Sequence, residues 1–511
     1  MTAHLTADVC VIGAGAGGAV VAAELAEGGA DVILLEQGPR HDPGAFTAHP
    51  PEMLARLYRD GGQTVTLGAP PILLPLGRGI GGTTLVNSGT CFRTPPRVLA
   101  RWERELGLET MTPAQLEPAF ARVEEALSIA PVTPALAGRN AEVARRGAAA
   151  LGWSHGWLRR NARGCVGSGV CAFGCPSGAK QDVGSVYVPR AQAAGARVLT
   201  GADVRRIVAR AGRVRGVEVR ISGAPGADSG AADADRGATG ALRGLPARAR
   251  EVFVAADTVV LAAGTIHTPG LLRRSRLAGR SGQLGRNLSL HPATAAFALM
   301  DEEVNMAHGV PQSLYVDEFA DEGIVFEGVA GPPAYAAASL PLTGRRHAEA
   351  MADYKRLAQF GLMVSDSSRG RVHVVAGRPV VRYDLVAADV AKVRAGLARL
   401  EQLFLAAGAR EVYLPLPPGT RPHQAKARDL KLMAFHPLGT ARAHRDPAQG
   451  VVDQDLRHHE VEGLHVADGS VVPSALGVNP QLTIMALATR LAYALLDRPI
   501  PTEETATACR S

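Results

Sequence analysis

The sequence has few aromatic residues and few cysteines, and it lacks two kinds of segment that would assign it to another class of protein. Aromatic residues make up 4% of the 511 residues, and six residues are cysteine. The formal net charge of +7 comes from scattered residues, and the lack of a basic segment interleaved with aromatics argues against nucleic-acid binding. No uninterrupted apolar run is long enough to cross a bilayer, so we expect no transmembrane segment.

A leader segment is also not expected. An apolar strand pattern begins within ten residues of Met1, which leaves no room for a signal or transit peptide. We therefore expect a cytoplasmic location, with export on a partner subunit as the alternative. Hydrophobic residues make up 46% and charged residues 20% of the chain, as in an ordinary globular protein. The length predicts two or more domains or one large bipartite fold.

The N-terminal segment has the order strand, turn, helix, strand. Residues 7–12 form an apolar strand pattern, residues 13–18 a glycine-rich turn, residues 19–27 a helix and residues 31–36 a second strand. This order predicts a dinucleotide-binding unit in an α/β fold. The alternative is a glycine-rich turn that binds no ligand.

Three glycines and one acid have distinct roles in such a unit. Gly13 permits the tight turn, Gly15 lets the backbone approach a pyrophosphate, and Gly18 lets helix and strand pack closely. The phosphates would lie at the helix N-terminus, which attracts anions. Glu36 ends the second strand, where a carboxylate binds a ribose and favours FAD or NAD over NADP.

Polar side chains gather in three short segments near the C-terminus, at residues 435–440, 467–470 and 478–483. His436 and Asn479 come from separate loops, and an apolar helix follows the second loop. Oxidising an alcohol requires a base for the hydroxyl proton and a donor for the developing alkoxide. A histidine suits the first role because its reference pKa is about 6.5, and an asparagine suits the second.

A second glycine-rich segment lies at residues 77–87, where glycines would let the backbone approach a large flat group. Together with residues 13–18, residues 261–269 and the tail from His436 to Thr483, this segment resembles the glucose-methanol-choline (GMC) oxidoreductases. The resemblance covers nearly the whole chain. It implies a Rossmann-like FAD-binding domain joined to a substrate domain built on a sheet.

The resemblance also implies a domain layout. Residues 1–290 would form a discontinuous FAD-binding domain that includes a cap and cysteine-rich segment at about 95–185 and a loose loop at 223–250. Residues 291–434 would bind substrate, and residues 435–500 would return to the FAD-binding domain. Short alternating patterns at 196–200, 203–208 and 216–220 predict a meander of strands, and residues 390–407 predict an amphipathic helix capped by Asp389.

By resemblance, His436 is the catalytic base and Asn479 is the donor that orients the substrate. The alternatives are a core histidine and a simple helix cap, because an asparagine before Pro480 is a good cap. The helix N-terminus would also stabilise the anion of a reduced flavin. The expected cofactor-binding residues are Gly13, Gly15, Gly18, Glu36, Gly82, Asn87, Val204, Asp468, Gly469, Asn479, Pro480 and Gln481.

The cysteines raise a separate question. Cys165, Cys171 and Cys175 keep the spacing of a bacterial ferredoxin segment, with Ser168 in place of the second cysteine. Three thiolates would suit a three-iron cluster, and the segment resembles that of bacterial FAD glucose dehydrogenases. Reduced structural thiols, a disulfide with one free thiol, or an incomplete zinc site are the alternatives.

The expected function is FAD-dependent oxidation of an alcohol CH–OH group to a carbonyl. Electrons would pass to oxygen, a quinone, a cytochrome or another acceptor subunit. The alternatives are a lyase of the same fold that performs no redox chemistry, and a flavin-bearing electron-transfer subunit. We expect non-covalent FAD, because no histidine lies between His49 and His155 to link the flavin near residues 77–87.

Overall fold

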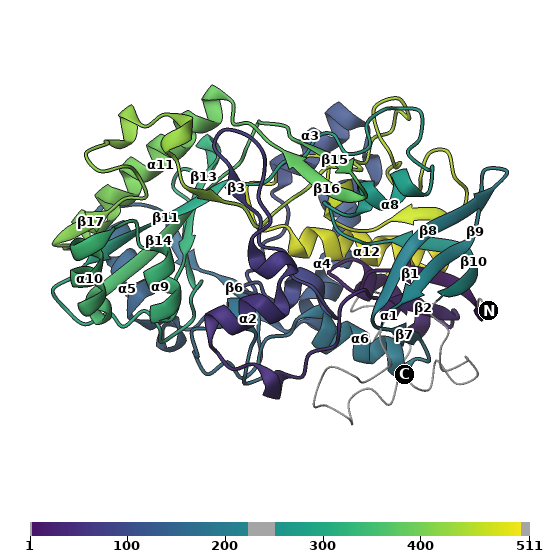
Figure 1. Cartoon of the computed structure of the whole chain (residues 1–511), viewed down its shortest axis with the longest axis horizontal. Helices are drawn as coiled ribbons and strands as arrows, with labels where there is room; N and C mark the ends of the chain where they lie inside the picture. Colours follow the sequence, from purple (N-terminus) through teal and green to yellow (C-terminus); the bar gives the residue numbers. More distant parts are fainter. Residues whose placement is uncertain (1–2, 223–250, 502–511) are drawn as a thin grey trace.

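The computed structural model describes residues 3–222 and 251–501, and the loop predicted at 223–250 lies outside the described residues. Two sheets are arranged side by side, with helix α12 (Gln481–Leu495) between them in the view of Figure 1. The fold is mixed α/β, as the sequence predicted. Within the described ranges, no helix combines the length and the apolar character needed to cross a bilayer.

The first sheet has the strand order β7-β2-β1-β10-β9-β8, and β19 also pairs with β10. The pairs among β7, β2, β1, β10 and β19 are parallel, whereas β9 pairs antiparallel with both β10 and β8. The strands are β1 (Ala3–Ile12), β2 (Val32–Leu35), β7 (Arg197–Leu199), β8 (Ala202–Arg210), β9 (Arg213–Ile221), β10 (Glu251–Leu261) and β19 (Leu464–Val466).

Strand β1 shows why this sheet lies in the core. Residues Val9 to Ile12 are all buried, as expected where helices cover both faces of a parallel sheet. Helix α1 packs against α6 and α12, and α12 also packs against α4, so helices from distant parts of the chain share one hydrophobic core with the sheet. These helices are α1 (Gly18–Glu27), α4 (Pro113–Ala126) and α6 (Val183–Ala193).

The second sheet has the order β3-β18-β11-β14-β13-β12-β5, and β17 also pairs with β11. Helices α5 (Pro134–Ala150) and α11 (Ala387–Ala406) pack against it. The strands are β3 (Ile72–Leu73), β5 (His155–Trp157), β11 (Ala293–Leu299), β12 (Leu314–Val316), β13 (Ile324–Gly328), β14 (Leu357–Val364), β17 (Glu411–Tyr413) and β18 (Leu432–Met433). Strands β3 and β5 thus come from the part of the chain before residue 291.

Two further pairs of strands and several helices complete the described fold. Strands β15 and β16 form a separate hairpin, and β4 pairs with β6. These elements are α2 (Pro50–Leu57), α3 (Pro96–Leu106), α8 (Thr268–Arg274), α9 (Pro333–Ser339), α10 (Gly344–Ala352), β4 (Ile129–Pro131), β6 (Arg159–Asn161), β15 (Arg371–Val375) and β16 (Arg378–Arg382).

Two local predictions need correction. The first strand of the expected meander, β7, pairs with β2 at the opposite edge of the sheet. Among the described residues, the antiparallel meander of this sheet consists of β8, β9 and β10. Asp389 does not cap α11: the helix starts at Ala387, and the carboxylate instead accepts hydrogen bonds from the backbone N–H groups of Ser367 and Ser368.

Candidate active site

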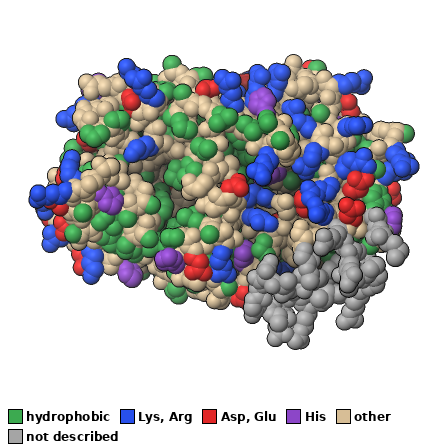
Figure 2. Space-filling view, viewed as in Figure 1, with side chains coloured by type: hydrophobic (Ala, Val, Ile, Leu, Met, Phe, Trp, Pro, Cys, Tyr) green, Lys and Arg blue, Asp and Glu red, His purple; other side chains and the backbone are tan. Residues whose placement is uncertain are grey.

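A cavity of about 1460 Å³ is lined by residues of both sheets. Pockets for drug-sized ligands span roughly 300–1,000 Å³, so this cavity can hold a dinucleotide together with a smaller molecule. The face shown in Figure 2 is hollowed, with hydrophobic side chains around the hollow. The cavity runs from Glu36 and Asp203 beside the first sheet to Met363 and Met433 beside the second.

The glycine-rich turn after β1 is shaped by close backbone packing. A Cβ atom on Gly13, whose φ is +100°, would lie 2.3 Å from the carbonyl oxygen of Ala262. A Cβ atom on Gly18 would lie 1.9 Å from the carbonyl oxygen of Gly13. Gly13 and Gly18 are therefore required by the fold itself.

Gly15 differs, because its nearest neighbour would be the Cα atom of Gly82, 3.9 Å from an added Cβ. Gly15 and Gly82 both line the cavity. Residues 13–18 and 77–87, far apart in the sequence, thus present bare backbone to the cavity at adjacent positions. This arrangement admits a large group close to the main chain, as the sequence predicted for a pyrophosphate and a flat ring.

Glu36 is buried at the end of β2 and braces this turn. Its two carboxylate oxygens accept hydrogen bonds from the backbone N–H groups of Ala14, at 3.0 Å, and Gly38, at 2.7 Å. Burial raises the pKa of Glu36, while those two bonds and the charges of Arg59 and Arg78 oppose the rise. Each carboxylate oxygen has a further lone pair available for a ribose hydroxyl.

Val204 lies near the same end of the cavity, on β8. Its carbonyl oxygen is 3.4 Å from the guanidinium of Arg274, and a register shift interrupts the β8–β9 pairing next to it. The irregular strand thus carries backbone groups to the cavity at Val204, which the resemblance implied to be a cofactor-binding residue.

Asp468 joins three segments beneath the glycine turn. Its carboxylate accepts hydrogen bonds from the backbone N–H groups of Gly264 and Ser470 and from the hydroxyl of Thr268. Burial raises the pKa of Asp468, and these bonds oppose the rise. The next residue, Gly469, has no room for a side chain, because an added Cβ would lie 2.8 Å from the hydroxyl oxygen of Thr265.

Gln481, the first residue of α12, connects the helix to the second glycine-rich segment. Asn87 donates to its side-chain oxygen at 2.8 Å, and its amide nitrogen donates to the carbonyl oxygen of Thr90 at 2.7 Å. The residue before it, Pro480, precedes the helix and also lines the cavity. The N-terminus of α12 therefore opens toward the cavity next to Asn87.

His436 and Asn479 meet in the same cavity. The Nε2 atom of His436, in the loop after β18, lies 3.4 Å from the amide nitrogen of Asn479, just before α12. The N-cap of α12 is Pro480, and the Oδ1 atom of Asn479 accepts no hydrogen bond among the described residues. The amide nitrogen of Asn479 donates to Glu327, so a simple cap does not account for this residue. Burial, and then the neighbouring His291, lower the pKa of His436 well below its usual value.

Two residues at this site were not singled out from the sequence. Glu327 on β13 accepts hydrogen bonds from the amide groups of Gln312, at 2.7 Å, and Asn479, at 3.3 Å. Burial raises its pKa to about 7. The Nδ1 atom of His291 lies 3.3 Å from Nδ1 of His436. The available signal for Glu327 was a single acid within the otherwise apolar strand Ile324–Gly328.

In the described residues, the three clustered cysteines are not arranged as a set of metal ligands, so the structure lends no support to the predicted iron cluster. Cys165, Cys171 and Cys175 line a space of about 10 Å³, which is at the lower limit for one ordered water. The Cys171 sulfur accepts a hydrogen bond from Arg160, and the Cys175 sulfur accepts one from the backbone N–H of Lys180. In residues 3–222 and 251–501, no three His, Cys, Asp or Glu residues are grouped to hold a metal.

The buried ammonium group of Lys180 shows what this segment does instead. It donates to the carbonyl oxygens of Leu85, at 2.6 Å, Asn87, at 2.9 Å, and Cys171, at 3.0 Å. The cysteine-rich segment is therefore attached to the second glycine-rich segment and supports one wall of the cavity.

Comparison with known proteins gives consistent matches over most of the chain. The N-terminal model of the GMC oxidoreductases matches residues 54–293, and the C-terminal model matches residues 366–488. The model of an NAD(P)-binding Rossmann-like domain matches residues 11–69.

Similar proteins occur in bacteria and plants. An uncharacterised GMC-type oxidoreductase of Mycobacterium tuberculosis is 42% identical over 95% of this chain and 75% of its own length. An uncharacterised GMC-type oxidoreductase of Sinorhizobium fredii is 34% identical over 96% of this chain and 95% of its own length. A long-chain-alcohol oxidase of Arabidopsis thaliana is 27% identical over 97% of this chain and 68% of its own.

Solved structures share the fold at low sequence identity. The structure of pyridoxine 4-oxidase from Mesorbium loti superposes with a TM-score of 0.72 at 20% identity, covering 96% of this chain and all of the other. A variant of the formate oxidase of Aspergillus oryzae superposes with a TM-score of 0.73 at 16% identity. The match covers 96% of this chain and 98% of the other.

Proposed function

Because the chain belongs to the GMC oxidoreductase family, we propose that it oxidises the CH–OH group of an alcohol to a carbonyl with a bound, non-covalent FAD. The observation that carries this proposal is the meeting of His436 and Asn479, 3.4 Å apart, in the cavity that the two glycine-rich segments share. FAD, when bound, supplies the acceptor for the hydride that leaves the alcohol carbon.

The described residues fit FAD. No side chain caps the N-terminus of α1 or of α12, and both Gly15 and Gly82 leave backbone exposed to the cavity. We assign the pyrophosphate to the N-terminus of α1 and the ribose to Glu36. We assign the adenine to the backbone near Val204 and the pyrimidine end of the flavin to the N-terminus of α12.

His436 and Asn479 act on the substrate in this proposal. Their side chains converge on one region of the cavity wall, so both can contact the same alcohol oxygen. Two polar groups on one oxygen fix the orientation of the C–H bond, and a donor among them stabilises negative charge that develops there.

Apolar side chains form part of the cavity wall beside the second sheet, and this favours alcohols with a hydrophobic chain or ring. The walls beside the second sheet include Leu73, Leu362, Met363, Leu432 and Met433. The similarity to a long-chain-alcohol oxidase of Arabidopsis thaliana supports the same choice. A hydrophobic chain gains roughly 0.8 kcal/mol for each methylene group that it buries.

Anaerobic absorbance spectroscopy tests the proposal. Purified protein should show an oxidised flavin spectrum that is bleached by 1-octanol or 1-dodecanol faster than by ethanol. His436→Ala and Asn479→Ala should each slow bleaching by about 10²- to 10³-fold while FAD remains bound. His423→Ala, which removes an exposed histidine, should bleach at the parental rate.

Two outcomes would contradict the proposal. Product formation without any colour change would indicate a lyase, and flavin that responds only to a reduced partner protein would indicate an electron-transfer subunit. Oxygen uptake during turnover then separates an oxidase from a dehydrogenase that uses another acceptor.

A further inference from the structure

The hairpin of β15 and β16 has one buried face and one exposed face. Val372 and Val381 are cross-strand partners, and both are buried. On the same strand, β15 packs against α8, the helix that follows β10 of the first sheet. Successive side chains of a strand point to opposite faces, so the residues between these buried positions point outward. They form three cross-strand pairs, namely Arg371–Arg382, His373–Val380 and Val375–Arg378.

One of these pairs is electrostatically unfavourable. Arg371 and Arg382 lie directly opposite each other, and like charges at such positions destabilise a sheet. The Nε atom of Arg382 is 3.4 Å from the carboxylate of Asp384, but an ion pair this exposed contributes little. Within the described ranges, Arg371 and Arg378 form no ion pair. The hairpin therefore gathers positive charge that an anionic partner would offset.

A segment from much earlier in the chain extends the exposed face. The backbone N–H of Leu67 donates to the carbonyl oxygen of Val381 at 2.8 Å, and that of Tyr383 donates to Leu67 at 2.9 Å. Leu67 is the bridge partner of Arg382, so their side chains point the same way, and Val65 follows two positions away. We call the combined face the hairpin surface; it consists of Val65, Leu67, Arg371, His373, Val375, Arg378, Val380 and Arg382.

Apolar side chains are unusually exposed on the hairpin surface. Leu67 is 60% exposed, Val375 58% and Val65 48%. Single exposed apolar residues are normal on a protein, whereas a group of them indicates an interaction site. Of the seven large apolar side chains that are exposed in the described residues, these three lie together. The hairpin surface thus combines aliphatic side chains with unpaired cations.

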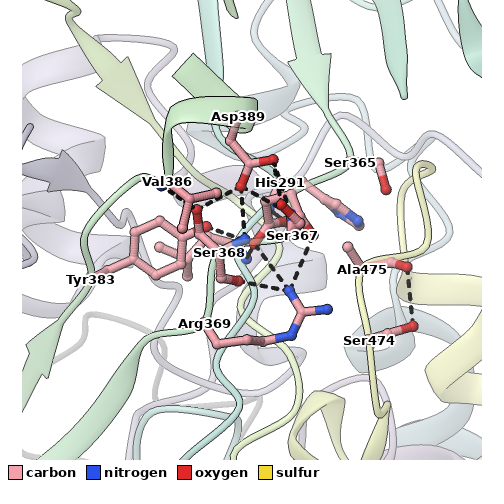
Figure 3. A network of polar contacts seen from close by, with 12 residues as sticks. His291, Ser365, Ser367, Ser368, Arg369, Tyr383, Val386, Asp389, Ser474 and Ala475 are labelled. Atoms are coloured by element: carbon pink, nitrogen blue, oxygen red, sulfur yellow. Dashed lines mark hydrogen bonds and ion pairs between the residues drawn. The ribbon is translucent and has the colours of Figure 1, made fainter. Parts of the chain in front are cut away.

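The base of the hairpin is fixed on both sides. The hydroxyl of Tyr383, the residue after β16, donates to the buried carboxylate of Asp366 at 2.6 Å. Before β15, the backbone N–H of Ser368 donates to Asp389 at 2.7 Å, and Arg369 donates to the carbonyl oxygen of Asp366 at 3.1 Å. Figure 3 shows Tyr383, Ser368 and Arg369 beside Asp389. The hairpin surface is therefore held in place before any partner binds.

The hairpin surface borders the cavity, because Val65 and Arg378 belong to both. Phe435, next to His436, also lines the cavity and is 44% exposed. In the part of the chain that the structure describes, no acid is both exposed and in the cavity lining. The charged residues that have both properties are Arg205, Arg274, Arg378, Arg428 and Lys431. Several Lys and Arg side chains accordingly lie on the same face as the hollow in Figure 2.

We propose that the hairpin surface docks the protein on a bilayer that contains anionic phospholipids. Arginines attract anionic headgroups, and exposed aliphatic side chains enter the boundary between headgroups and acyl chains. A protein interface would instead concentrate its apolar residues in a core depleted of charge. Here Val375 is paired with Arg378 and Leu67 with Arg382, so apolar and cationic side chains alternate across one surface.

Docking by this surface places the mouth of the cavity at the bilayer. A hydrophobic alcohol dissolved in the bilayer can then pass to the apolar cavity wall without crossing bulk water. This consequence rests on the proposed oxidation of hydrophobic alcohols, whereas the docking itself does not.

Flotation of the FAD-bound protein with lipid vesicles tests the docking. The protein should float with vesicles of phosphatidylcholine and phosphatidylglycerol, but not with phosphatidylcholine alone, and added salt should weaken binding. Arg371→Gln combined with Arg382→Gln should weaken binding roughly 30-fold, because each arginine near anionic lipid contributes several-fold. This variant should unfold at the parental temperature or above, because it removes the unfavourable pair.

The matched control is Arg345→Gln combined with Arg346→Gln. Both residues are exposed on α10, to the left in Figure 1 and away from the hairpin, and the net charge falls by the same amount. The control should bind close to the parental affinity. No flotation with the anionic vesicles, or equal losses in the two variants, would overturn the proposal.

Leu67→Trp tests whether the hairpin surface enters the lipid. Its added fluorescence, after subtraction of the wild-type spectrum, should shift to shorter wavelength on anionic vesicles and be quenched by brominated acyl chains. Val65→Ser combined with Leu67→Ser should weaken vesicle binding about tenfold or more. Equally tight binding to soluble polyglutamate, without quenching by the brominated lipid, would indicate an acidic protein partner and overturn the lipid assignment.

Anaerobic flavin reduction separates docking from the proposed function. With 1-dodecanol carried in anionic vesicles, the variant lacking Arg371 and Arg382 should bleach roughly tenfold more slowly than the parent, because less protein is docked. With water-soluble 1-butanol and no vesicles, the two should bleach at the same rate. If no alcohol bleaches the wild-type flavin, the proposed function fails, while flotation and quenching still decide whether the hairpin surface binds lipid.

Discussion

At the scale of single residues, the glycines of the N-terminal turn separate into two kinds. A Cβ atom on Gly17 would lie 1.6 Å from the carbonyl oxygen of Ala467, whereas a Cβ atom on Gly15 would meet only the Cα atom of Gly82, at 3.9 Å. Gly17 is thus required by packing between β1 and the segment after β19. A side chain at position 15 would meet no protein atom at close range, so Gly15 instead leaves space for a ligand.

The pair Gly15→Ala and Gly17→Ala tests this distinction. Gly17→Ala should destabilise the FAD-free protein by about 1–3 kcal/mol or more, because the new methyl group overlaps backbone atoms. Gly15→Ala should leave the free energy of unfolding nearly unchanged and weaken FAD binding by roughly tenfold, about 1.4 kcal/mol. Denaturant unfolding of the apoprotein and titration of FAD fluorescence measure the two quantities. Equal effects of both variants on the apoprotein would contradict the assignment.

At the scale of elements, α11 contributes an anchor for the loop beside His291. Asp389 lies in the first turn of this helix, and its carboxylate accepts from the backbone N–H groups of Ser367 and Ser368 and from the hydroxyl of Ser368. Burial raises the pKa of Asp389, but the bonds from the two serines and the charge of Lys392 outweigh burial and lower it overall. The loop position is therefore tied to an ionised carboxylate.

Replacing Asp389 with asparagine should lower the free energy of unfolding by about 1–3 kcal/mol at neutral pH, because the amide lacks the negative charge and offers one acceptor oxygen in place of two. Since the folded-state pKa is depressed, the stabilisation is present above the ordinary pKa of an aspartate. It is lost as the pH falls through the folded-state value. Denaturant unfolding at a series of pH values should show the two proteins converging in acid. Asp353→Asn, at an exposed site, serves as the control, and a difference that persists in acid would refute the ionic account.

The elements also show what local sequence patterns can predict. The patterns located β1, α1, β2, β8, β9 and α11 to within a few residues. This is because the spacing of apolar residues that distinguishes helix from strand is a local property of the sequence. They did not predict that β7 pairs with β2 or that β3 and β5 join the second sheet, since such pairing depends on contacts distant in sequence. The same limit hid Glu327, whose significance comes only from its contact with Asn479.

At the scale of the whole molecule, the cavity touches both sheets, so we expect FAD to stabilise the assembled structure. Free FAD at 100 times its dissociation constant should add about 2.7 kcal/mol to the free energy of unfolding. The thermal midpoint of the apoprotein should therefore rise with FAD concentration. Acid precipitation should release the flavin into solution, because we propose a non-covalent complex. Yellow colour that stays with the washed precipitate would contradict this.

The motifs predicted which segments line the candidate site, but they did not predict the hydrogen bonds between the residues of those segments. Residues 13–18, 77–87 and the loops of His436 and Asn479 do line one cavity. The His291 ring that contacts His436 is held by the backbone N–H groups of Leu476 and Gly477, and backbone groups leave no trace in a residue pattern. The cysteine spacing predicted a cluster, but the described cysteines are not grouped as ligands, because spacing along the chain does not fix how close the sulfur atoms lie in the fold.

The contact between Gly17 and Ala467 has a consequence for how the protein is made. The nucleotide turn emerges first from the ribosome, whereas β19 and α12, which complete its packing, emerge about 450 residues later, on the order of a minute at typical rates of synthesis. During that interval the apolar face of α1 that later meets α12 lacks its partner. The growing chain therefore has to protect this face, and a chaperone that binds short apolar helices is the expected companion of the nascent protein.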